Sequence, residues 1–357
     1  EMKHDQEDLS LKTVRIGTVG AKFAGSFHAD VWKNLPGAEI TAVVNRGEEA
    51  RLAFQKKYGI RKAYADYRDL LADPDVDVVD VCVPNYLHGE ISSAALLAGK
   101  HVICEKPFAT TMEDAEKVLE AWKKSGRSYF YAEDWIFAPA LKRAEAIYRS
   151  GGIGKGFYFK GKETHSGSHS PYAQTIEYCG GGAIIHLGSH PIGYFNHLLG
   201  LPSEVTGCCN GGRKDNFIHK SLEGEDWGLG VLHYPGGEKV LVEGNYITVG
   251  GMDDVVEFYG DQGVIKVELT FGSPLSVFST KGIDYTVEKA ETTVGWSRPA
   301  VGESESLGYR PELAHFLACI QGTETQIAGT TAQGGFDTFR IIHTLYRSSR
   351  EGRTLPI

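Results

Sequence analysis

The N-terminal third of the chain alternates short apolar runs with amphipathic helical patterns, and this alternation limits the fold more than any other feature. Short apolar runs bounded by turn residues predict buried strands, and apolar residues three or four apart predict helices. Strands that are apolar throughout and alternate with helices predict an α/β fold with a doubly wound parallel sheet covered on both faces. The expected strands are Thr13–Val19, Glu39–Val44, Val78–Val83, His101–Cys104 and Ser128–Tyr131, and the expected helices are Phe23–Asn34, Glu48–Tyr58, Asp66–Leu71, Glu90–Ala98 and Glu113–Lys124.

The pattern changes after residue 132. Pro235-Gly236-Gly237 and Gly260-Asp261-Gln262-Gly263 are typical of hairpin connections. We therefore predict a dinucleotide-binding domain at residues 10–132 and an α+β domain at residues 133–357 with an open, mainly antiparallel sheet. Its expected elements are helix Phe137–Ser150, strand Lys155–Thr164, helix Ala183–Leu199, strands and turns from Ser203 to Lys289, and helices Glu312–Ile320 and Thr331–Ser348.

The composition excludes several classes of partner. The 357 residues carry a formal net charge of −9 and no block of basic residues, which argues against nucleic acid or an anionic membrane as a partner. No run approaches the ~18 consecutive apolar residues of a membrane span, and the polar, acidic N-terminus is unlike a signal peptide. The six cysteines include no CxxC pair, so we expect reduced thiols and a cytoplasmic protein.

A glycine-rich turn, Gly20-Ala21-Lys22-Phe23-Ala24-Gly25, follows the first predicted strand. Between a buried strand and an amphipathic helix, such a turn favours a dinucleotide whose pyrophosphate lies at the helix N-terminus. Lys22 stands where the middle glycine of the G-x-G-x-x-G pattern would let the backbone approach the phosphates, although a lysine can also bring a positive charge to them. We expect Gly20, Lys22, Phe23 and Ala24 to contact a nicotinamide cofactor.

The end of the second predicted strand bears on the choice between NAD and NADP. A carboxylate there would hold the ribose 2′-hydroxyl of NAD, but the strand ends in Asn45-Arg46. Arg46 suits the 2′-phosphate of NADP, whereas Asn45 can hydrogen-bond a ribose hydroxyl of NAD. The sequence therefore allows either NAD or NADP. Arg46 could also be an exposed residue after a strand, with no part in cofactor binding.

Two later predicted strands end in residues that suit a catalytic cleft. One runs into Pro84-Asn85, with His88 three residues further on, and these residues are expected to border the nicotinamide. The next ends in Glu105-Lys106-Pro107. Because ligands of doubly wound folds bind at the carboxyl ends of the strands, Lys106 is predicted to lie where it can carry a proton.

These motifs, in this order, resemble the Gfo/Idh/MocA family of oxidoreductases. The resemblance implies a Rossmann domain followed by an open-sheet domain, and hydride transfer between a nicotinamide, tightly bound in some members, and a sugar or cyclitol carbon. It implies that Lys106 faces the reacting hydroxyl, that Glu105 lies near the cofactor and that the Lys106–Pro107 bond is cis. The motifs that carry it are Gly20-x-x-x-x-Gly25-x-x-His28, Pro84-Asn85-x-x-His88 and Ala98-Gly99-Lys100-His101-Val102-x-Cys104-Glu105-Lys106-Pro107.

The resemblance also implies a second catalytic element, an aspartate and a histidine four residues apart on a helix after a glycine run. In this chain the run Gly180-Gly181-Gly182 leads to His186 and His190, and His186 stands where the aspartate is expected. His190, alone or with His186, is then expected to exchange the hydroxyl proton beside Lys106.

Other polar and aromatic residues are candidates for binding the substrate. The resemblance includes a branch of the family with a His-rich loop after the strand Lys155–Thr164, and this loop would hang over the cleft. Alternatively, the loop could be solvated and make no contact with the substrate. Trp135 could likewise pack in the interface between the domains and not stack on the substrate. The expected substrate-binding residues are Glu133, Trp135, His165, His169, Tyr172 and Tyr309.

The expected function is that of an NAD(P)-dependent dehydrogenase acting on a sugar, glycoside or cyclitol, with oxidation at C3 of a glycoside as the sharper hypothesis. Three alternatives stay open: a glycosidase that works through transient oxidation, a metal-assisted enzyme in which His186 and His190 hold an ion with Glu133 or Glu163, and a non-catalytic cofactor-sensing protein. We expect no bound metal. The open C-terminal sheet also predicts a homo-oligomer.

Overall fold

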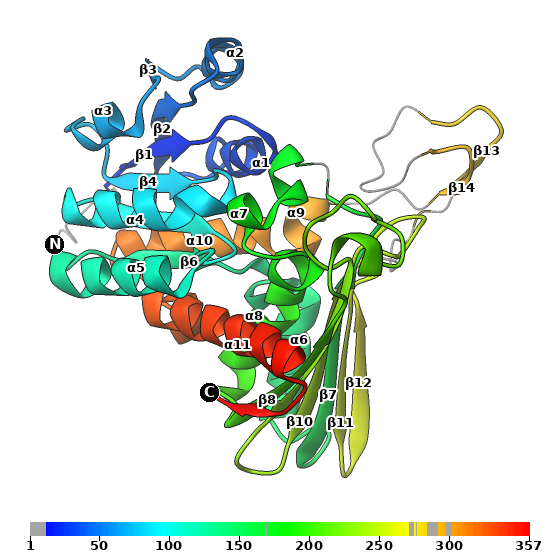
Figure 1. Ribbon diagram of the computed structural model, residues 1–357. Coiled ribbons are helices and arrows are strands. Elements are labelled where there is room, and N and C mark those ends of the chain that lie inside the picture. Colours follow the sequence, from blue (N-terminus) through cyan, green and yellow to red (C-terminus); the bar gives the residue numbers. More distant parts are fainter. Residues whose placement is uncertain (1–11, 169, 271–274, 276, 284–291, 298–301) are drawn as a thin grey trace, which may run out of the picture.

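The computed structural model describes residues 12–168, 170–270, 275, 277–283, 292–297 and 302–357 (Figure 1). Its first sheet has six parallel strands in the order β3-β2-β1-β4-β5-β6, which confirms the predicted doubly wound arrangement. The direction of winding reverses between β1 and β4, and ligands of such sheets bind at the carboxyl edge there. The strands are β1 (Val14–Val19), β2 (Ala38–Val44), β3 (Lys62–Tyr64), β4 (Val78–Val81), β5 (His101–Glu105) and β6 (Tyr129–Ala132).

Helices cover both faces of this sheet, as predicted. Successive strand residues point to opposite faces, so Val78 and Ile103 pack with Trp32 of α1, whereas Val79 and Val102 belong to the core on the other face. Strand β3 was not predicted, because its three half-buried residues are too few to show a period. The helical segments are α1 (Phe23–Trp32), α2 (Glu48–Tyr58), α3 (Tyr67–Leu71), the 3-10 turn η1 (Asn85–Leu87), α4 (His88–Leu97) and α5 (Met112–Ser125).

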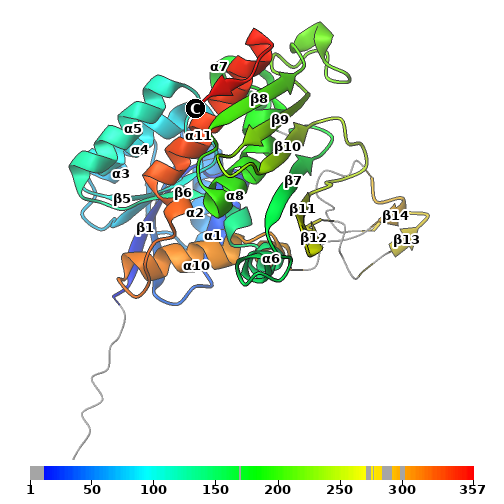
Figure 2. The same ribbon diagram turned by 90° about the horizontal axis from the view of Figure 1, so that it is seen from below.

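A second sheet of seven strands has the order β12-β11-β7-β10-β9-β8-β15 (Figure 2). Its neighbours pair antiparallel except β7 and β10, so the prediction of an open, mainly antiparallel sheet is confirmed. A separate ribbon pairs β13 with β14, and residues 284–291, where part of the predicted strand series falls, lie outside the described residues. The strands are β7 (Gly156–Thr164), β8 (Glu204–Cys209), β9 (Trp227–His233), β10 (Lys239–Asn245), β11 (Val255–Gly260), β12 (Gly263–Glu268), β13 (Val277–Ser279), β14 (Gly295–Ser297) and β15 (Leu355–Pro356).

The predicted helix Ala183–Leu199 has two parts, which corrects the expectation of one regular helix. It begins with a π-helical turn, η4, and continues as α8. Such turns widen a helix locally and are often found at functional sites. The helical segments of this half are η2 (Asp134–Ile136), α6 (Pro139–Arg149), η3 (Pro171–Gln174), α7 (Ile176–Cys179), η4 (Ile184–Gly188), α8 (Ser189–Leu199), η5 (Arg213–Asp215), α9 (Glu303–Ser306), α10 (Tyr309–Ile320), η6 (Ala328–Thr330) and α11 (Ala332–Glu351).

The last two long helices return to the first sheet (Figure 1). Phe316 of α10 lies 4.8 Å, between ring centroids, from Phe130 of β6. Gly335 of α11 packs so closely on Phe108 and Tyr131 that a Cβ there would lie 2.6 Å from Phe108. Further along α11, the backbone contacts β8 of the second sheet at Gly207. The C-terminal helices therefore join the two sheets into one core.

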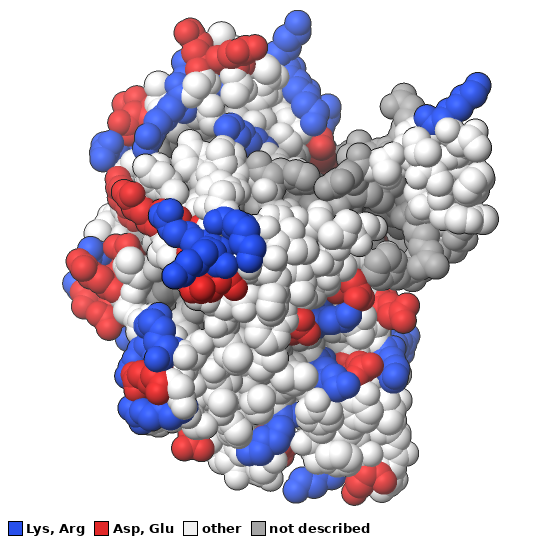
Figure 3. Space-filling view, turned by 45° about the vertical axis from the view of Figure 1, so that its right-hand side comes forward, with Lys and Arg blue, Asp and Glu red and all other residues white. Residues whose placement is uncertain are grey.

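The surface agrees with the composition. Basic and acidic side chains are interspersed on the face shown in Figure 3. In the part of the chain that the structure describes, no helix combines the length and the apolar character needed to cross a membrane.

Candidate active site

The turn between β1 and α1 requires its glycines. Gly20 has a φ of 111°, and a Cβ there would lie 2.0 Å from the carbonyl oxygen of Cys82. A Cβ on Gly25 would lie 2.0 Å from the carbonyl oxygen of Gly20. Lys22 is the N-cap residue of α1 and makes no side-chain cap hydrogen bond. The exposed backbone N–H groups of such a helix end fit the pyrophosphate of a dinucleotide.

Asn45 and Arg46 lie at the carboxyl end of β2, beside the glycine turn. The side-chain amide of Asn45 donates to the carbonyl oxygen of Gly47 at 3.1 Å, and Arg51 donates to the carbonyl oxygen of Asn45 at 2.7 Å. Arg46 is exposed. This is the side of the crevice on which a dinucleotide-binding sheet holds the adenosine ribose, so their contacts with the cofactor stay a prediction.

His88 ties the loop after β4 to the loop after β5. Its Nδ1 lies 2.7 Å from the carbonyl oxygen of Pro107, and its Nε2 lies 2.9 Å from that of Val83. Burial lowers the pKa of His88, but Cys104 and the two carbonyl oxygens raise it to about 9. Two acceptors require two N–H donors, so His88 is an imidazolium that fixes the Glu-Lys-Pro segment. The Lys106–Pro107 bond in that segment is cis, as expected.

Lys106 points from the first sheet toward the second half of the chain. Its Nζ donates to the backbone carbonyl oxygen of His186 at 2.6 Å, and its backbone N–H donates to a carboxylate oxygen of Glu105 at 3.1 Å. The carbonyl of His186 belongs to the π-helical turn η4 and also accepts from the Ser189 hydroxyl at 3.2 Å. The two predicted catalytic elements therefore meet in space.

The imidazole of His186 is engaged at both nitrogens. The side-chain amide of Asn85 donates to the carbonyl oxygen of Cys179 at 3.1 Å and faces Nε2 of His186 at 3.0 Å. Because the amide nitrogen is a donor, Nε2 is the acceptor. The proton then sits on Nδ1, which donates to the hydroxyl oxygen of Tyr246 at 2.5 Å. His186 is a neutral imidazole that joins Asn85 of the first half to Tyr246 of the second sheet.

His190 lies among three carboxyl groups and one indole ring. Its Nδ1 is 2.7 Å from an oxygen of Glu133 and 3.0 Å from one of Asp134, and its Nε2 is 3.3 Å from an oxygen of Glu163. Trp135 stacks on the ring at a centroid distance of 5.7 Å. Glu133 accepts the hydrogen bond of Nδ1, whereas the contact of Nε2 with Glu163 is an ion-pair distance without a hydrogen bond.

Burial changes the protonation of this cluster. Burial lowers the pKa of His190, but Glu163 and the other carboxylates raise it well above its usual value. Burial raises the pKa of Glu133 to about 7 even though His190 opposes the change, and burial raises the pKa of Asp254 well above its usual range. His190 is thus an imidazolium near neutral pH, and the Glu133 carboxyl beside it gains or loses its proton in the same pH range.

The metal hypothesis is not supported by these contacts. Both nitrogens of His186 are already hydrogen-bonded, so the pair His186 and His190 is not arranged to hold an ion. Within the described residues, two groups have potential ligand atoms within 4.8 Å of one another, namely His28, Asp80 and Cys82, and Glu133, Asp134 and His190. In each of these groups the histidine nitrogen contacts a carboxylate oxygen at hydrogen-bond distance.

A cavity of about 250 Å³ lies between the two halves and is bordered by most of the predicted residues. Glu133 is buried behind His190, whereas Gly20, Lys22, Asn45 and Arg46 are not part of the cavity wall. His169 lies outside the described residues. The predicted residues that border the cavity are Phe23, Ala24, Pro84, Asn85, His88, Glu105, Lys106, Trp135, His165, Tyr172, His186, His190 and Tyr309.

Several residues of the cavity wall were not predicted from the sequence. Tyr246 directly follows β10 and Asp254 directly precedes β11, and both strands pair with β7, which contains Glu163. These three residues therefore lie at one end of the second sheet. Each of them lies at the end of a strand, but only the strand order shows that these ends are neighbours. Other missed residues of the wall are Phe27, Tyr178 and Met252.

Two family models cover most of the chain. The model described as "Oxidoreductase family, NAD-binding Rossmann fold" matches residues 14–133, and the model described as "Oxidoreductase family, C-terminal alpha/beta domain" matches residues 149–357. The chain belongs to the Gfo/Idh/MocA oxidoreductase family. This Rossmann domain is NAD-binding, and the glycine turn at the N-terminus of α1 fits a dinucleotide. The family resemblance seen in the sequence is thereby confirmed.

Relatives with a named activity include sugar dehydrogenases and inositol dehydrogenases. D-apiose dehydrogenase of Paraburkholderia graminis is 25% identical over 358 residues, which cover 98% of this chain and 91% of that protein. Levoglucosan dehydrogenase of Pseudarthrobacter phenanthrenivorans is 29% identical over 211 residues, covering 55% of this chain and 54% of that protein. Among solved structures, GenD2 from gentamicin A biosynthesis, in complex with NAD, superposes with a TM-score of 0.90 at 22% identity, covering 98% of this chain and 97% of that one.

Proposed function

We propose that this chain is an NAD-dependent dehydrogenase that oxidises a hydroxyl-bearing carbon of a sugar, glycoside or cyclitol. The observation that carries the proposal is the position of Lys106, which leaves the first sheet at the cavity and contacts His186 of the second half. The family relation and the sugar substrates named for its relatives support the same reaction class.

The proton steps follow from the contacts of the chain itself. Bound NAD supplies the hydride acceptor. Lys106 takes the hydroxyl proton, because its amine borders the cavity and contacts a backbone carbonyl oxygen. His190 is an imidazolium, so its part is to donate a hydrogen bond from Nε2 to the substrate oxygen, while Glu133 and Asp134 orient the ring at Nδ1.

The wall formed by the second half suits a polyhydroxylated ligand. His165, Tyr172 and Tyr246 border the cavity beside the acids Glu163 and Asp254. Sugar hydroxyls both donate and accept hydrogen bonds, which matches a wall of imidazole, phenol and carboxyl groups. The indole of Trp135 also borders the cavity, and an aromatic face of this kind can stack on the apolar face of a sugar ring. Oxidation at C3 of a glycoside stays the sharper hypothesis.

The test is turnover with purified protein. NAD is incubated with levoglucosan, D-apiose, myo-inositol and a panel of alkyl glycosides, and absorbance at 340 nm is followed. NADH formation with at least one of them is the expected result. Release of the alkyl group with no net change at 340 nm would instead indicate a glycosidase that oxidises transiently. If the protein binds NAD but turns over none of the sugars by either readout, the proposal fails.

Three further expectations stay predictions. The open face of the second sheet favours a homo-oligomer, which sedimentation velocity tests. A cytoplasmic location and use of NADP through Arg46 are likewise open to direct measurement. A titration with NADP beside NAD tests the use of NADP, because a contact with the 2′-phosphate would raise the affinity for NADP above that for NAD.

A further inference from the structure

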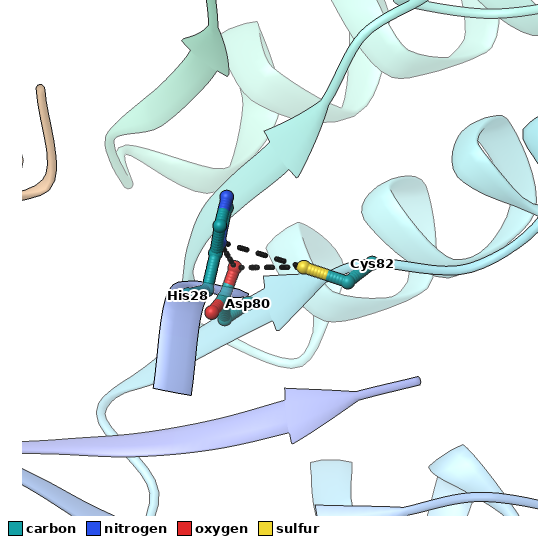
Figure 4. Close-up of side chains that lie close together, drawn as sticks. All are labelled: His28, Asp80 and Cys82. Atoms are coloured by element: carbon teal, nitrogen blue, oxygen red, sulfur yellow. Dashed lines mark hydrogen bonds and ion pairs between the residues drawn. The ribbon is translucent and has the colours of Figure 1, made fainter. Parts of the chain in front are cut away.

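One histidine outside the predicted catalytic set lies between two buried carboxylates. Nδ1 of His28, on α1, is 2.9 Å from an oxygen of Asp80, and Nε2 is 3.1 Å from an oxygen of Glu105. The side chain of His28 is 0% exposed. Figure 4 shows the close contact of His28 with Asp80 and Cys82. The contacts join α1 to the ends of β4 and β5.

The alternation of the strands explains why these residues meet. Val78 of β4 and Ile103 of β5 pack on the α1 side of the sheet. Residues two positions along a strand share a face, so Asp80 and Glu105 point to the same side. His28 lies above them on α1. The arrangement therefore follows from the register of three elements.

His28 has to be charged in this position. Two carboxylate acceptors require two N–H donors, and only the imidazolium has both. The groups that face it fit this state. Trp32 donates to the second oxygen of Asp80 at 2.9 Å, burial raises the pKa of the Cys82 thiol, and burial raises the pKa of the Glu312 carboxyl, on α10, well above its usual range. Burial lowers the pKa of His28, but Asp80 and its other neighbours raise it well above its usual value.

Glu105 is held as a carboxylate at the cavity. One oxygen contacts His28, and the other accepts the backbone N–H of Lys106 at 3.1 Å. Burial raises the pKa of Glu105, but the hydrogen bond from His28 leads to a net lowering. Glu105 ends β5, on the side of the glycine turn away from β2. Since the adenosine half of a dinucleotide lies toward β2, Glu105 belongs to the nicotinamide half.

We propose that His28 is a positioning residue that holds Glu105 as a fixed anion, and that this anion makes the site bind NAD⁺ more tightly than NADH. The inference rests on the proposed function in requiring that NAD binds in this cleft. The oxidised nicotinamide ring carries a positive charge and the reduced ring is neutral, so a carboxylate in a water-poor cleft favours the oxidised form. Lys106 and His190 lie near Glu105 as well, and they are unchanged when Glu105 alone is replaced, so the contribution of the carboxylate is the change in preference that this replacement causes.

The test compares the dissociation constants of NAD⁺ and NADH for cofactor-stripped protein, measured by calorimetry without substrate. Glu105→Gln should lower the preference for NAD⁺ over NADH by about tenfold, the size expected for one charge at a partly buried site. His28→Gln should lower it in the same direction. His101→Gln is the matched control. His101 begins the same strand and accepts the backbone N–H of Ser128 at 3.1 Å. The His101→Gln protein should prefer NAD⁺ over NADH as strongly as the wild type does.

A pH series adds a readout that a purely structural role of His28 would not move. The wild-type preference for NAD⁺ should be lost at low pH, where Glu105 becomes protonated, and Glu105→Gln should show no such change. In His28→Gln the loss should begin at a higher pH, because Glu105 has lost its imidazolium partner.

The outcomes separate the inference from the proposed function. If both cofactor forms bind to Glu105→Gln with the wild-type preference, the inference is wrong and the proposed function is unaffected. A His28→Gln protein that keeps the wild-type preference and pH profile overturns the role of His28. Should His28→Gln not fold, the comparison of the wild type with Glu105→Gln across pH still decides the role of the carboxylate. Failure of the wild type to bind either form would contradict the proposed function itself.

Discussion

The amine of Lys106 donates a hydrogen bond of 2.6 Å to the backbone carbonyl oxygen of His186. The contact joins the end of β5 to the π-helical turn before α8, and so brings together residues from the two halves of the chain. A backbone acceptor can hold the amine in place, yet it gives the proton no further group to pass to. The proton taken from the substrate therefore has to leave Lys106 through solvent or another wall residue of the cavity.

Replacing Lys106 by alanine should remove the proton acceptor and leave the cofactor turn intact. We expect kcat/KM for the best sugar to fall by a factor of about 10²–10⁴, the usual contribution of a general base, with the affinity for NAD close to that of the wild type. Steady-state kinetics at 340 nm and an NAD titration check this. Lys124→Ala, on the exposed face of α5, is the control and should be fully active. Loss of NAD binding with normal turnover of the remaining complex would contradict the assignment.

Tyr246→Phe should lower kcat/KM for the sugar and leave the affinity for NAD unchanged. The variant removes the hydroxyl oxygen that accepts from Nδ1 of His186. A lost buried hydrogen bond costs about 1–2 kcal/mol, so kcat/KM for the sugar should fall about tenfold. The matched control is Tyr259→Phe on β11, whose hydroxyl donates to Glu257 at 2.7 Å. Equal activity of both variants would show that Tyr246 does not act on the substrate.

Glu225→Gln should change how stability depends on pH. Glu225 accepts from the backbone N–H of Ile184 at 2.8 Å and from the hydroxyl of Tyr346 at 2.7 Å, and burial raises its pKa to about 7. A raised folded-state pKa gives stability that is complete below the unfolded pKa and is lost as the pH rises through 7. The Glu225 carboxyl should therefore cost the wild type about 2 kcal/mol of unfolding free energy between pH 5 and pH 8.

The measurement is urea unfolding of both proteins across that pH range. The unfolding free energy of Glu225→Gln should fall by about 2 kcal/mol less than that of the wild type between pH 5 and pH 8. Glu120 is an exposed acid on α5, so Glu120→Gln should show the pH dependence of the wild type. Parallel curves for Glu225→Gln and the wild type would rule out a raised pKa at this position.

Gly20→Ala and Gly126→Ala separate a close contact from backbone strain. Both glycines have a left-handed φ, but a Cβ on Gly20 would meet the carbonyl oxygen of Cys82, whereas a Cβ on Gly126 would meet nothing within 4 Å. Gly126→Ala should cost about 1 kcal/mol of stability. Gly20→Ala should cost more and should also weaken NAD binding, as thermal unfolding and an NAD titration would show. If the two variants lose the same stability and both bind NAD normally, the turn is not the pyrophosphate site.

Much of the fold could be predicted because its signals are local. The periods of the apolar residues located β1, β2, β4, β5 and β6 to within a few residues, and Glu105-Lys106-Pro107 stood out because an acid, a base and a proline end an apolar run. β3 was missed because three residues carry no period. Tyr246 and Asp254 were missed because nothing local distinguishes them, and they reach the cavity only through the pairing of β10 and β11 with β7.

The sequence by itself determined the order of strands and helices, the glycine turn and the placing of Lys106 at a strand end, since each depends on residues a few positions apart. Tertiary structure alone decided which side chains of the site contact one another. His28 lies between Asp80 and Glu105, and His186 contacts Lys106 with its carbonyl and Tyr246 with its ring. These contacts span long stretches of sequence, so they depend on strand order, register and helix packing. The partners also decide that the imidazole of His28 is charged and that of His186 is neutral, which the residue type alone cannot show.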